Sequence, residues 1–167
     1  MKDMENVNYS EWVPMGALVK GLMVMFSAII VFVSCILLLW GRTSGEDAFG
    51  LLFGWGVLAF VLFLFWNYRG LKIQISGSRL FVKYGLFNQK SFLLKDIASC
   101  KKTTAHFGKY LGIGVRYGFD GSIAYTTSFG NAVEVTPKRG NKFVFSSKRP
   151  SQVCGIIEEG IMSSEVG

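Results

Sequence analysis

The residues best suited to covalent chemistry are one cysteine and one histidine in the second half of the chain. Cys100 precedes His106 by six residues, and Lys101 and Lys102 follow the cysteine directly, where they would favour a thiolate. A cysteine nucleophile needs its histidine base in contact with the thiol. We expect no such contact here, with Cys100 an ordinary strand cysteine and His106 an ordinary loop histidine.

No other pattern predicts catalysis, a cofactor or a metal ion. The single histidine has no carboxylate or thiolate partners at metal-ligand spacing. The acidic residues of the second half form no evident acid–base pair. Gly112-Ile-Gly114 lacks the Lys-Ser/Thr of a phosphate-binding loop, so we interpret it as a turn before a strand. We predict a protein that is not an enzyme and has no cofactor.

Basic residues are the main functional signal, and they form three groups. The first surrounds the central loop, the second lies on the first predicted hairpin, and the third crowds the last hairpin. In that order they are Lys101, Lys102, Lys109 and Arg116; Lys72, Arg79 and Lys83; and Lys138, Arg139, Lys142, Lys148 and Arg149. Two interpretations stay open: a general positive surface facing anionic lipid, or a defined site for a headgroup or partner with the first two groups as its contacts.

The positive charge belongs to the second half of the chain. The net charge is +7 over 167 residues. Residues 1–68 carry three Lys or Arg against five acids (−2), and residues 69–167 carry fifteen against six (+9). A basic domain tethered to a bilayer is attracted first to anionic headgroups. We expect no nucleic-acid partner, because no recognition-helix or RNA-binding signature is present.

That tether is predicted by two apolar blocks without a charge. They cover residues 21–40 and 48–66, joined by a seven-residue polar break. At about 1.5 Å per residue each block spans roughly 30 Å, the thickness of a bilayer's hydrocarbon core. We predict an antiparallel transmembrane hairpin within residues 1–69, followed by one domain at 70–167. Gly50, Gly54 and Gly56 favour close packing of the two helices or, alternatively, dimerisation.

Charge near the membrane ends predicts the orientation. Four basic residues follow the second block closely (Arg69, Lys72, Arg79 and Lys83), whereas the connecting break has only Arg42. The positive-inside rule therefore predicts an inner or plasma membrane protein with both termini in the cytoplasm. Three scattered cysteines agree with reduced thiols in that compartment. Trp12, Trp40, Trp66 and Tyr68 are expected at the membrane interfaces.

The second half predicts short antiparallel strands and a final helix. Apolar and polar residues alternate at 71–75 and 79–84, on either side of the turn signal Gly77-Ser78, which indicates a hairpin. Further strands are expected near 89–94, 98–103, 114–117, 123–127, 132–138 and 141–146. Pro150 suits the first turn of a helix. Val153, Ile156, Ile157 and Ile161 then fall on one helical face. The expected fold class is α+β, with about seven strands in a bent sheet capped by this helix.

Several segments resemble bacterial pleckstrin-homology-like (PH-like) domains. The similar segments are Tyr84-Gly-Leu-Phe87, Lys95-Asp-Ile-Ala98, Gly112-Ile-Gly-Val-Arg116, Asn131-Ala-Val-Glu-Val135, Gly140, Phe143-Val-Phe-Ser-Ser147 and Pro150. The resemblance covers roughly residues 70–163. It implies a seven-stranded, strongly bent sheet or partly open barrel closed by a helix, often preceded by a two-helix membrane hairpin. It supplies no catalytic residues.

Taken together, the sequence predicts a membrane-anchored PH-like protein that scaffolds or binds at the inner membrane surface. Its ligand would be an anionic lipid or a protein. The alternative is an accessory subunit of a larger membrane transporter or envelope complex, in which the hairpin packs against a membrane-protein partner. An enzyme using Cys100 or His106 is the third possibility.

Overall fold

The computed structural model describes residues 7–39, 45–105, 112–118 and 120–165. These fall into two compact units. One comprises Gly16–Arg69, and the other combines Met1–Met15 with Gly70–Gly167. The N-terminal segment groups with residues 70–167, whereas the sequence analysis assigned it to residues 1–69 together with the hairpin.

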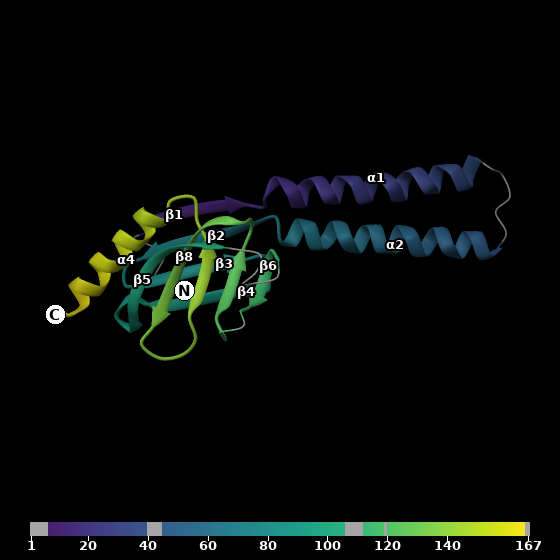
Figure 1. Cartoon of the computed structure of the whole chain (residues 1–167). Helices are drawn as coiled ribbons and strands as arrows, with labels where there is room; N and C mark the ends of the chain where they lie inside the picture. The colour runs from purple at the N-terminus through teal and green to yellow at the C-terminus, as the bar shows by residue number, and fades with distance from the viewer. Residues whose placement is uncertain (1–6, 40–44, 106–111, 119, 166–167) are drawn as a thin grey trace. The chain divides into compact units, whose positions relative to one another are not determined.

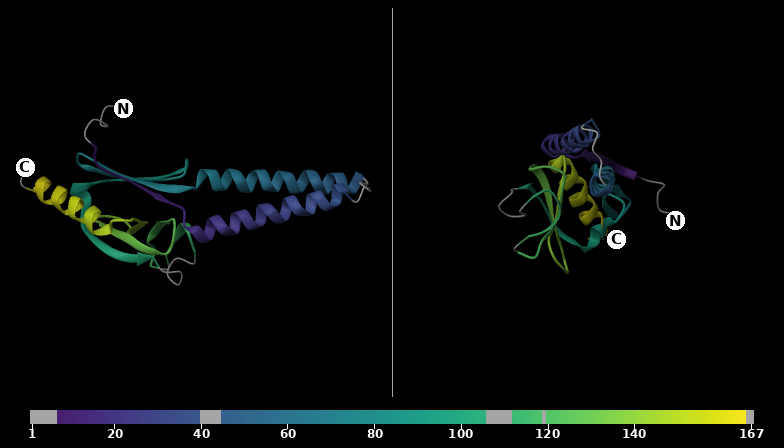
Figure 2. Two further views of the ribbon diagram at one scale, coloured as in Figure 1. Left: turned by 90° about the horizontal axis from the view of Figure 1, so that it is seen from above. Right: turned by 90° about the vertical axis from the view of Figure 1, so that its right-hand side faces the viewer.

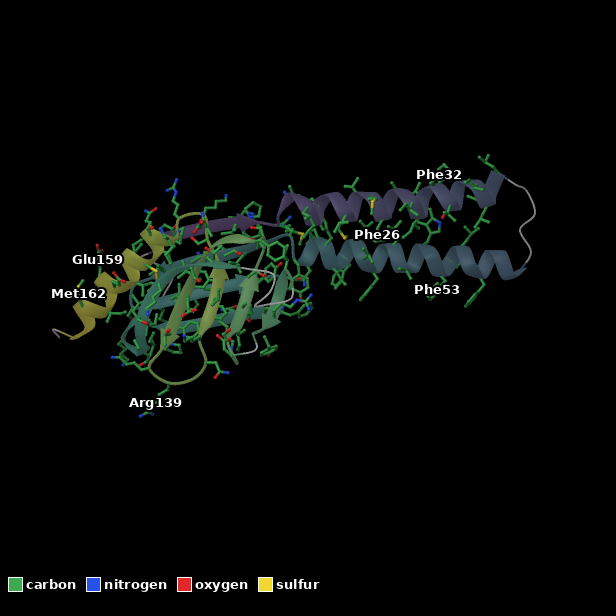
Figure 3. All side chains as sticks on the ribbon, in the orientation of Figure 1. Phe26, Phe32, Phe53, Arg139, Glu159 and Met162 are labelled. Atoms are coloured by element: carbon green, nitrogen blue, oxygen red, sulfur yellow. A yellow bond between two sulfur atoms is a disulfide. The ribbon has the colours of Figure 1, made fainter. Side chains whose placement is uncertain are left out.

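The first unit is a pair of long apolar helices, α1 (Ala17–Leu39) and α2 (Gly45–Asn67), which lie side by side (Figures 1 and 2). Among the described residues, Ala17–Leu39 and Phe49–Asn67 are long and apolar enough to cross a membrane. Phe32 and Phe53 project outward from the pair (Figure 3) and are 66% and 67% exposed. Large apolar side chains therefore cover the outside of the hairpin, as they do in lipid-facing helices.

The glycine-rich face of α2 does not pack against α1. A Cβ atom added at Gly50, Gly54 or Gly56 would meet nothing within 4 Å. The contact between the helices uses other positions, including buried Ser34 on α1 and Leu58 on α2. The prediction of close packing through these glycines is wrong, because no part of α1 approaches any of the three.

The second unit contains two β-sheets. The four-stranded sheet has the order β1-β2-β3-β4, and the five-stranded sheet has the order β5-β8-β9-β7-β6. The strands are β1 (Val7–Pro14), β2 (Gly70–Ser76), β3 (Arg79–Tyr84), β4 (Asn88–Leu93), β5 (Ile97–Ala105), β6 (Gly114–Tyr117), β7 (Ile123–Thr126), β8 (Gly130–Pro137) and β9 (Phe143–Ser146). Each predicted strand is present. All pairings in the described residues are antiparallel except β7 with β9, which is parallel and was not expected.

The N-terminal strand β1 is the element that the sequence analysis missed. Val7–Pro14 pairs antiparallel with β2, with Pro14 opposite Gly70 and Val7 opposite Ser76. Both helices of the hairpin therefore form the connection between two neighbouring strands. Trp12, expected at a membrane interface beside α1, lies on this strand and remains 46% exposed.

The core lies between the two sheets. From β2 and β3 it receives Leu71, Ile73 and Val82, all fully buried. An aromatic cluster joins the sheets: the Tyr84 and Tyr125 ring centroids are 6.2 Å apart, and Tyr125 meets Phe143 edge-on at 4.9 Å. Such pairs add about 0.5–1.5 kcal/mol each to the apolar burial.

The C-terminal helix α4 (Pro150–Glu165) packs against the five-stranded sheet and against η1 (Leu94–Asp96), a short 3₁₀ helix after β4. It begins at Pro150, as predicted. Val153 and Ile157 are fully buried, which confirms the expected apolar face. Met162, on the opposite face, is 60% exposed and projects outward with Glu159 (Figure 3).

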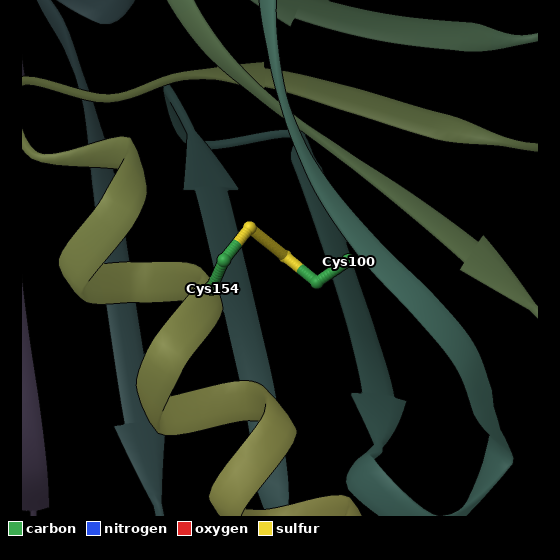
Figure 4. Close-up of a disulfide and its surroundings, with 2 residues drawn as sticks. All are labelled: Cys100 and Cys154. Carbon is green, nitrogen blue, oxygen red and sulfur yellow. A yellow bond between two sulfur atoms is a disulfide. The ribbon is translucent and has the colours of Figure 1, made fainter.

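A disulfide between Cys100 on β5 and Cys154 on α4 fastens this helix to the sheet (Figure 4). The Cα atoms are 5.4 Å apart, within the range that a disulfide bridges. The expectation that all three cysteines are reduced thiols is therefore wrong. Sequence spacing could not reveal the pair, since 54 residues separate its members and only the packing of α4 on β5 joins them.

Buried Glu11 ties β1 to the start of α4. Its carboxylate accepts hydrogen bonds from the Ser147 hydroxyl (2.8 Å), the Lys148 backbone N–H (2.7 Å) and the Tyr9 hydroxyl (3.1 Å). Burial and the nearby Glu11 carboxylate raise the pKa of Tyr9 to about 12, which keeps its hydroxyl a donor. Hydrogen bonds to a charged group contribute about 1.5–3 kcal/mol each, so Glu11 fixes the edge strand firmly.

Two glycines of α4 give a matched test of its packing. An added Cβ at Gly155 would meet nothing within 4 Å, whereas one at Gly160 would strike Leu94, lying 3.4 Å from its Cγ and nearer to Cδ1. We expect Gly155→Ala to raise the free energy of unfolding by up to about 1 kcal/mol through helix propensity. Gly160→Ala should lower it by about 1–3 kcal/mol through overpacking. Denaturant unfolding of the full chain in detergent measures both, and equal stabilisation by both would contradict the packing of α4 on η1.

Candidate functional site

The strongest candidate site is an open cleft at one end of the β unit, with a volume of about 730 Å³. We call it the cationic cleft. Its lining residues are Arg79, Ser91, Phe92, Leu93, Asp96, Pro137, Lys138 and Arg139. The volume is within the range of about 300–1,000 Å³ that is usual for small-ligand sites.

Three chain segments meet to build this cleft. Strand pairing places Arg79, the first residue of β3, opposite Leu93 at the end of β4. Backbone hydrogen bonds hold η1 between its neighbours: Leu94 N–H donates to Ser78 O (2.8 Å), and Lys138 N–H donates to Asp96 O (2.7 Å). The β2–β3 turn, η1 and the end of β8 are therefore joined around the cleft by main-chain contacts.

The cleft is electropositive. Arg79, Lys138 and Arg139 supply three positive charges against the single carboxylate of Asp96. Within the described part of the chain, none of these three cations is in an ion pair. Lys142, on the same turn, differs because its Nζ lies 3.3 Å from Glu134 Oε1. Arg139 extends from the β8–β9 turn into solvent (Figure 3), where it is accessible to a ligand.

Part of the lining is apolar. The Phe92 ring contacts Phe143 of the core at a centroid distance of 5.4 Å, and Leu93 and Pro137 flank it. The Ser91 hydroxyl adds a neutral hydrogen-bonding group. Guanidinium groups bind phosphate or carboxylate oxygens in pairs. The cleft therefore suits a ligand with a phosphate or carboxylate group next to an apolar part.

The predicted basic group of the first hairpin is divided by the structure. Lys72 and Lys83 are directly opposite each other on β2 and β3, and both side chains are exposed. Arg79 lies at the other end of the same strands, in the cationic cleft. The sheet thus places these three residues in two different surroundings.

The group predicted around the central loop is not gathered either. Lys101 and Lys102 are exposed on β5, and Arg116 is exposed on β6. β5 and β6 are the opposite edges of the five-stranded sheet, with three strands between them. Lys109 and His106 lie outside the described residues.

Lys138 and Arg139 were noted in the sequence but not selected as site residues. The β8–β9 hairpin itself was predicted, so the turn position was available as a signal. What the sequence does not show is that this turn lies beside Arg79, because that proximity depends on how the two sheets pack.

The cysteine nucleophile considered from the sequence is not available in this structure. Cys100 is bonded to Cys154, so its sulfur cannot act as a thiolate while the disulfide is intact. In the ranges that the structure describes, no three His, Cys, Asp or Glu side chains are grouped as metal ligands would be.

Comparison of the chain with protein-family models, with curated proteins and with solved structures finds no match. The site must therefore be interpreted from its own residues.

The disulfide predicts a stability difference that depends on reductant. A link across 54 residues is expected to contribute about 2–4 kcal/mol to folding. Adding reductant, or the double substitution Cys100→Ser/Cys154→Ser, should lower the thermal midpoint of the full chain in detergent. Cys35→Ser is the control and should not, because Cys35 is free. Iodoacetamide labelling of the unfolded, unreduced chain should modify one cysteine, and labelling of all three would contradict the pair.

Proposed function

We propose that this chain is a two-span membrane protein whose β domain binds an anionic group in the cationic cleft. The observation that carries the proposal is that Arg79, Lys138 and Arg139 all line one cleft beside Phe92. The role is one of binding or scaffolding at a membrane surface, without a chemical step. The outward apolar side chains of α1 and α2 support the membrane location.

The cleft lies at the end of β2 and β3 that is remote from the connection to the helices. Arg79 stands opposite Ser76, the last residue of β2, whereas the chain leaves α2 and enters β2 at Gly70. A strand of this length extends about 20 Å. We therefore propose a phosphate- or carboxylate-bearing molecule from solution as the ligand, and the phosphatidylglycerol competition described below distinguishes it from a lipid headgroup.

A PH-like fold for this domain is part of the proposal. The two curved sheets and the capping helix α4 support it. Two features depart from a seven-stranded meander: the additional strand β1 and the parallel pairing of β7 with β9. The proposal therefore uses the architecture alone and takes no binding residue from the resemblance.

The alternative role, an accessory subunit of a larger membrane complex, is favoured by one observation. The face of α2 that carries Gly50 and Gly54 is open within the described hairpin. Small residues let a neighbouring helix approach closely in a membrane. A partner helix at this face is compatible with anion binding in the domain.

We propose further that the β domain and both termini are cytoplasmic, because Arg69, Lys72 and Lys83 outnumber Arg42 near the membrane ends. The disulfide is the opposing feature, since disulfides persist mainly in oxidising compartments. In a bacterial host, green fluorescent protein fused after Gly167 should fluoresce, and alkaline phosphatase fused there should be inactive. Active phosphatase at that position would reverse the orientation and place the disulfide on the oxidising side.

The cleft is tested by titrating pyrophosphate onto the full chain in phosphatidylcholine nanodiscs, with calorimetric detection. The triple substitution Arg79→Gln/Lys138→Gln/Arg139→Gln should weaken binding roughly tenfold or more. Hydrogen bonds from cations to phosphate oxygens contribute about 1.5–3 kcal/mol each before solvent screening.

The control Lys101→Gln/Lys102→Gln/Arg116→Gln removes the same charge from elsewhere and should leave binding nearly unchanged. If both triple variants weakened pyrophosphate binding equally, the binding would result from the general positive charge of the domain and not from a site in the cleft. Adding phosphatidylglycerol to the nanodisc should not displace pyrophosphate, and displacement would assign the cleft to membrane lipid.

A further inference from the structure

Both connections to the hairpin leave the β unit from the same end of one sheet. Pro14 at the end of β1 is paired with Gly70 at the start of β2. Two residues separate Pro14 from the start of α1 at Ala17, and two separate the end of α2 at Asn67 from Gly70. Three Cα–Cα steps reach about 11 Å at most. Covalent geometry alone therefore keeps this end of the sheet near any bilayer that the helices cross.

Large apolar side chains are exposed at that end. Pairing of Leu71 with Tyr84 and of Tyr84 with Asn88 places the β3–β4 turn there. Phe87 in this turn is 75% exposed and Leu86 is 54% exposed. Gly85, with φ of 71°, provides the left-handed conformation that the turn requires. The turn thus presents two apolar side chains where the chain enters and leaves its helices.

Trp12 belongs to the same end. A Cβ atom at Gly70 would lie 2.7 Å from Cε2 of the Trp12 indole, so the ring lies directly over the glycine backbone. Absence of a side chain at Gly70 is what makes room for this ring. An indole at the start of a membrane connection is placed as interfacial tryptophans are.

Two lysines complete the surface. The register aligns Trp12 with Lys72, Lys72 with Lys83, and Lys83 with Gln89, in one row across the sheet. Like charges directly opposite each other destabilise a strand pair. An anionic surface would relieve this repulsion, and lysine stems are long enough to reach headgroups while the sheet stays above them.

We infer that Trp12, Lys72, Lys83, Leu86 and Phe87 form a membrane-contact rim that seats the β domain on an anionic bilayer. The inference rests on the proposed membrane location of the hairpin. The partner of this surface is the lipid interface of the membrane. The apolar side chains enter the interface, and the two lysines contact anionic headgroups. The rim and the cationic cleft lie at opposite ends of β2, so lipid and soluble anion occupy separate surfaces.

The test measures depth in nanodiscs of phosphatidylcholine containing phosphatidylglycerol. An environment-sensitive nitrobenzoxadiazole label is attached to single thiols of the full chain, and lipids with nitroxide-labelled chains quench it. The native free cysteine, Cys35, reports insertion of α1. In a Cys35→Ser background, Phe87→Cys reports the rim and Asn141→Cys, exposed at the opposite end of the domain, is the control.

We expect strong quenching at Cys35, clear quenching at Phe87→Cys and little at Asn141→Cys. Adding Lys72→Gln/Lys83→Gln should lower the phosphatidylglycerol-dependent quenching at Phe87→Cys, because each lysine is expected to contribute roughly fivefold to the equilibrium constant for membrane contact. Lys101→Gln/Lys102→Gln is the matched control and should have little effect.

The outcomes separate the two proposals. Quenching at Cys35 with none at Phe87→Cys would overturn the rim and leave the membrane location standing. No quenching at Cys35 would overturn the membrane location itself. If the two pairs of lysine substitutions lowered the quenching at Phe87→Cys equally, the membrane contact would be a general electrostatic attraction. That result would overturn the assignment of the rim to these residues.

Discussion

The pairing of β1 with β2 is the constraint on which the rest of this structure depends. It makes the two long helices the connection between neighbouring antiparallel strands, so the helices start and finish at adjacent backbone positions. Adjacent strands lie about 4.8 Å apart. The register from Pro14–Gly70 to Val7–Ser76 then determines which end of the sheet the helices leave. Without this pairing, the β domain would be attached to the helices only through the connection at Gly70.

Strand pairing alone would be a weak anchor for a segment at the edge of a sheet. Glu11 reinforces it from within the domain by accepting hydrogen bonds from the β9–α4 junction, 136 and 137 residues away along the chain. The same junction leads into the helix that the Cys100–Cys154 disulfide holds against β5. The N-terminal strand and the C-terminal helix are thus fixed to one another as well as to the sheets.

Most elements could be predicted because their signals are local. The two apolar blocks, the strands from β2 to β9 and the capping helix each follow from periodicity or from turn residues. β1 could not be recognised in this way, because Glu11 stands on its buried face, where alternation predicts an apolar residue. Glu11 can be buried because Ser147 and Lys148, which are distant in the sequence, donate hydrogen bonds to its carboxylate. The disulfide and the parallel pairing of β7 with β9 are likewise consequences of tertiary packing.

The candidate site shows the same division between local and tertiary information. Basic residues could be listed from the sequence, but their grouping by chain position was misleading. Lys72 and Arg79 belong to one hairpin yet occupy opposite ends of it, whereas Arg79 and Arg139 are distant in the sequence and share a cleft. A strand separates neighbours by about 3.3 Å per residue. Arg79 pairs with Ser76, four residues along β2 from Lys72, so about 13 Å of strand is enough to move a charge from one surface of the domain to another.

This separation gives the domain its proposed mechanical role. β2 and β3 place the cationic cleft about 20 Å along the strands from the connection to the helices at Gly70. The cross-links at Glu11 and Cys154 oppose any hinge between the edge strand, the sheets and the capping helix. A ligand bound beside Arg79 would then keep a nearly fixed distance from the rim. A fixed spacing of this kind fits the proposed binding role, because it separates the site proposed for a soluble ligand from the surface proposed to meet lipid.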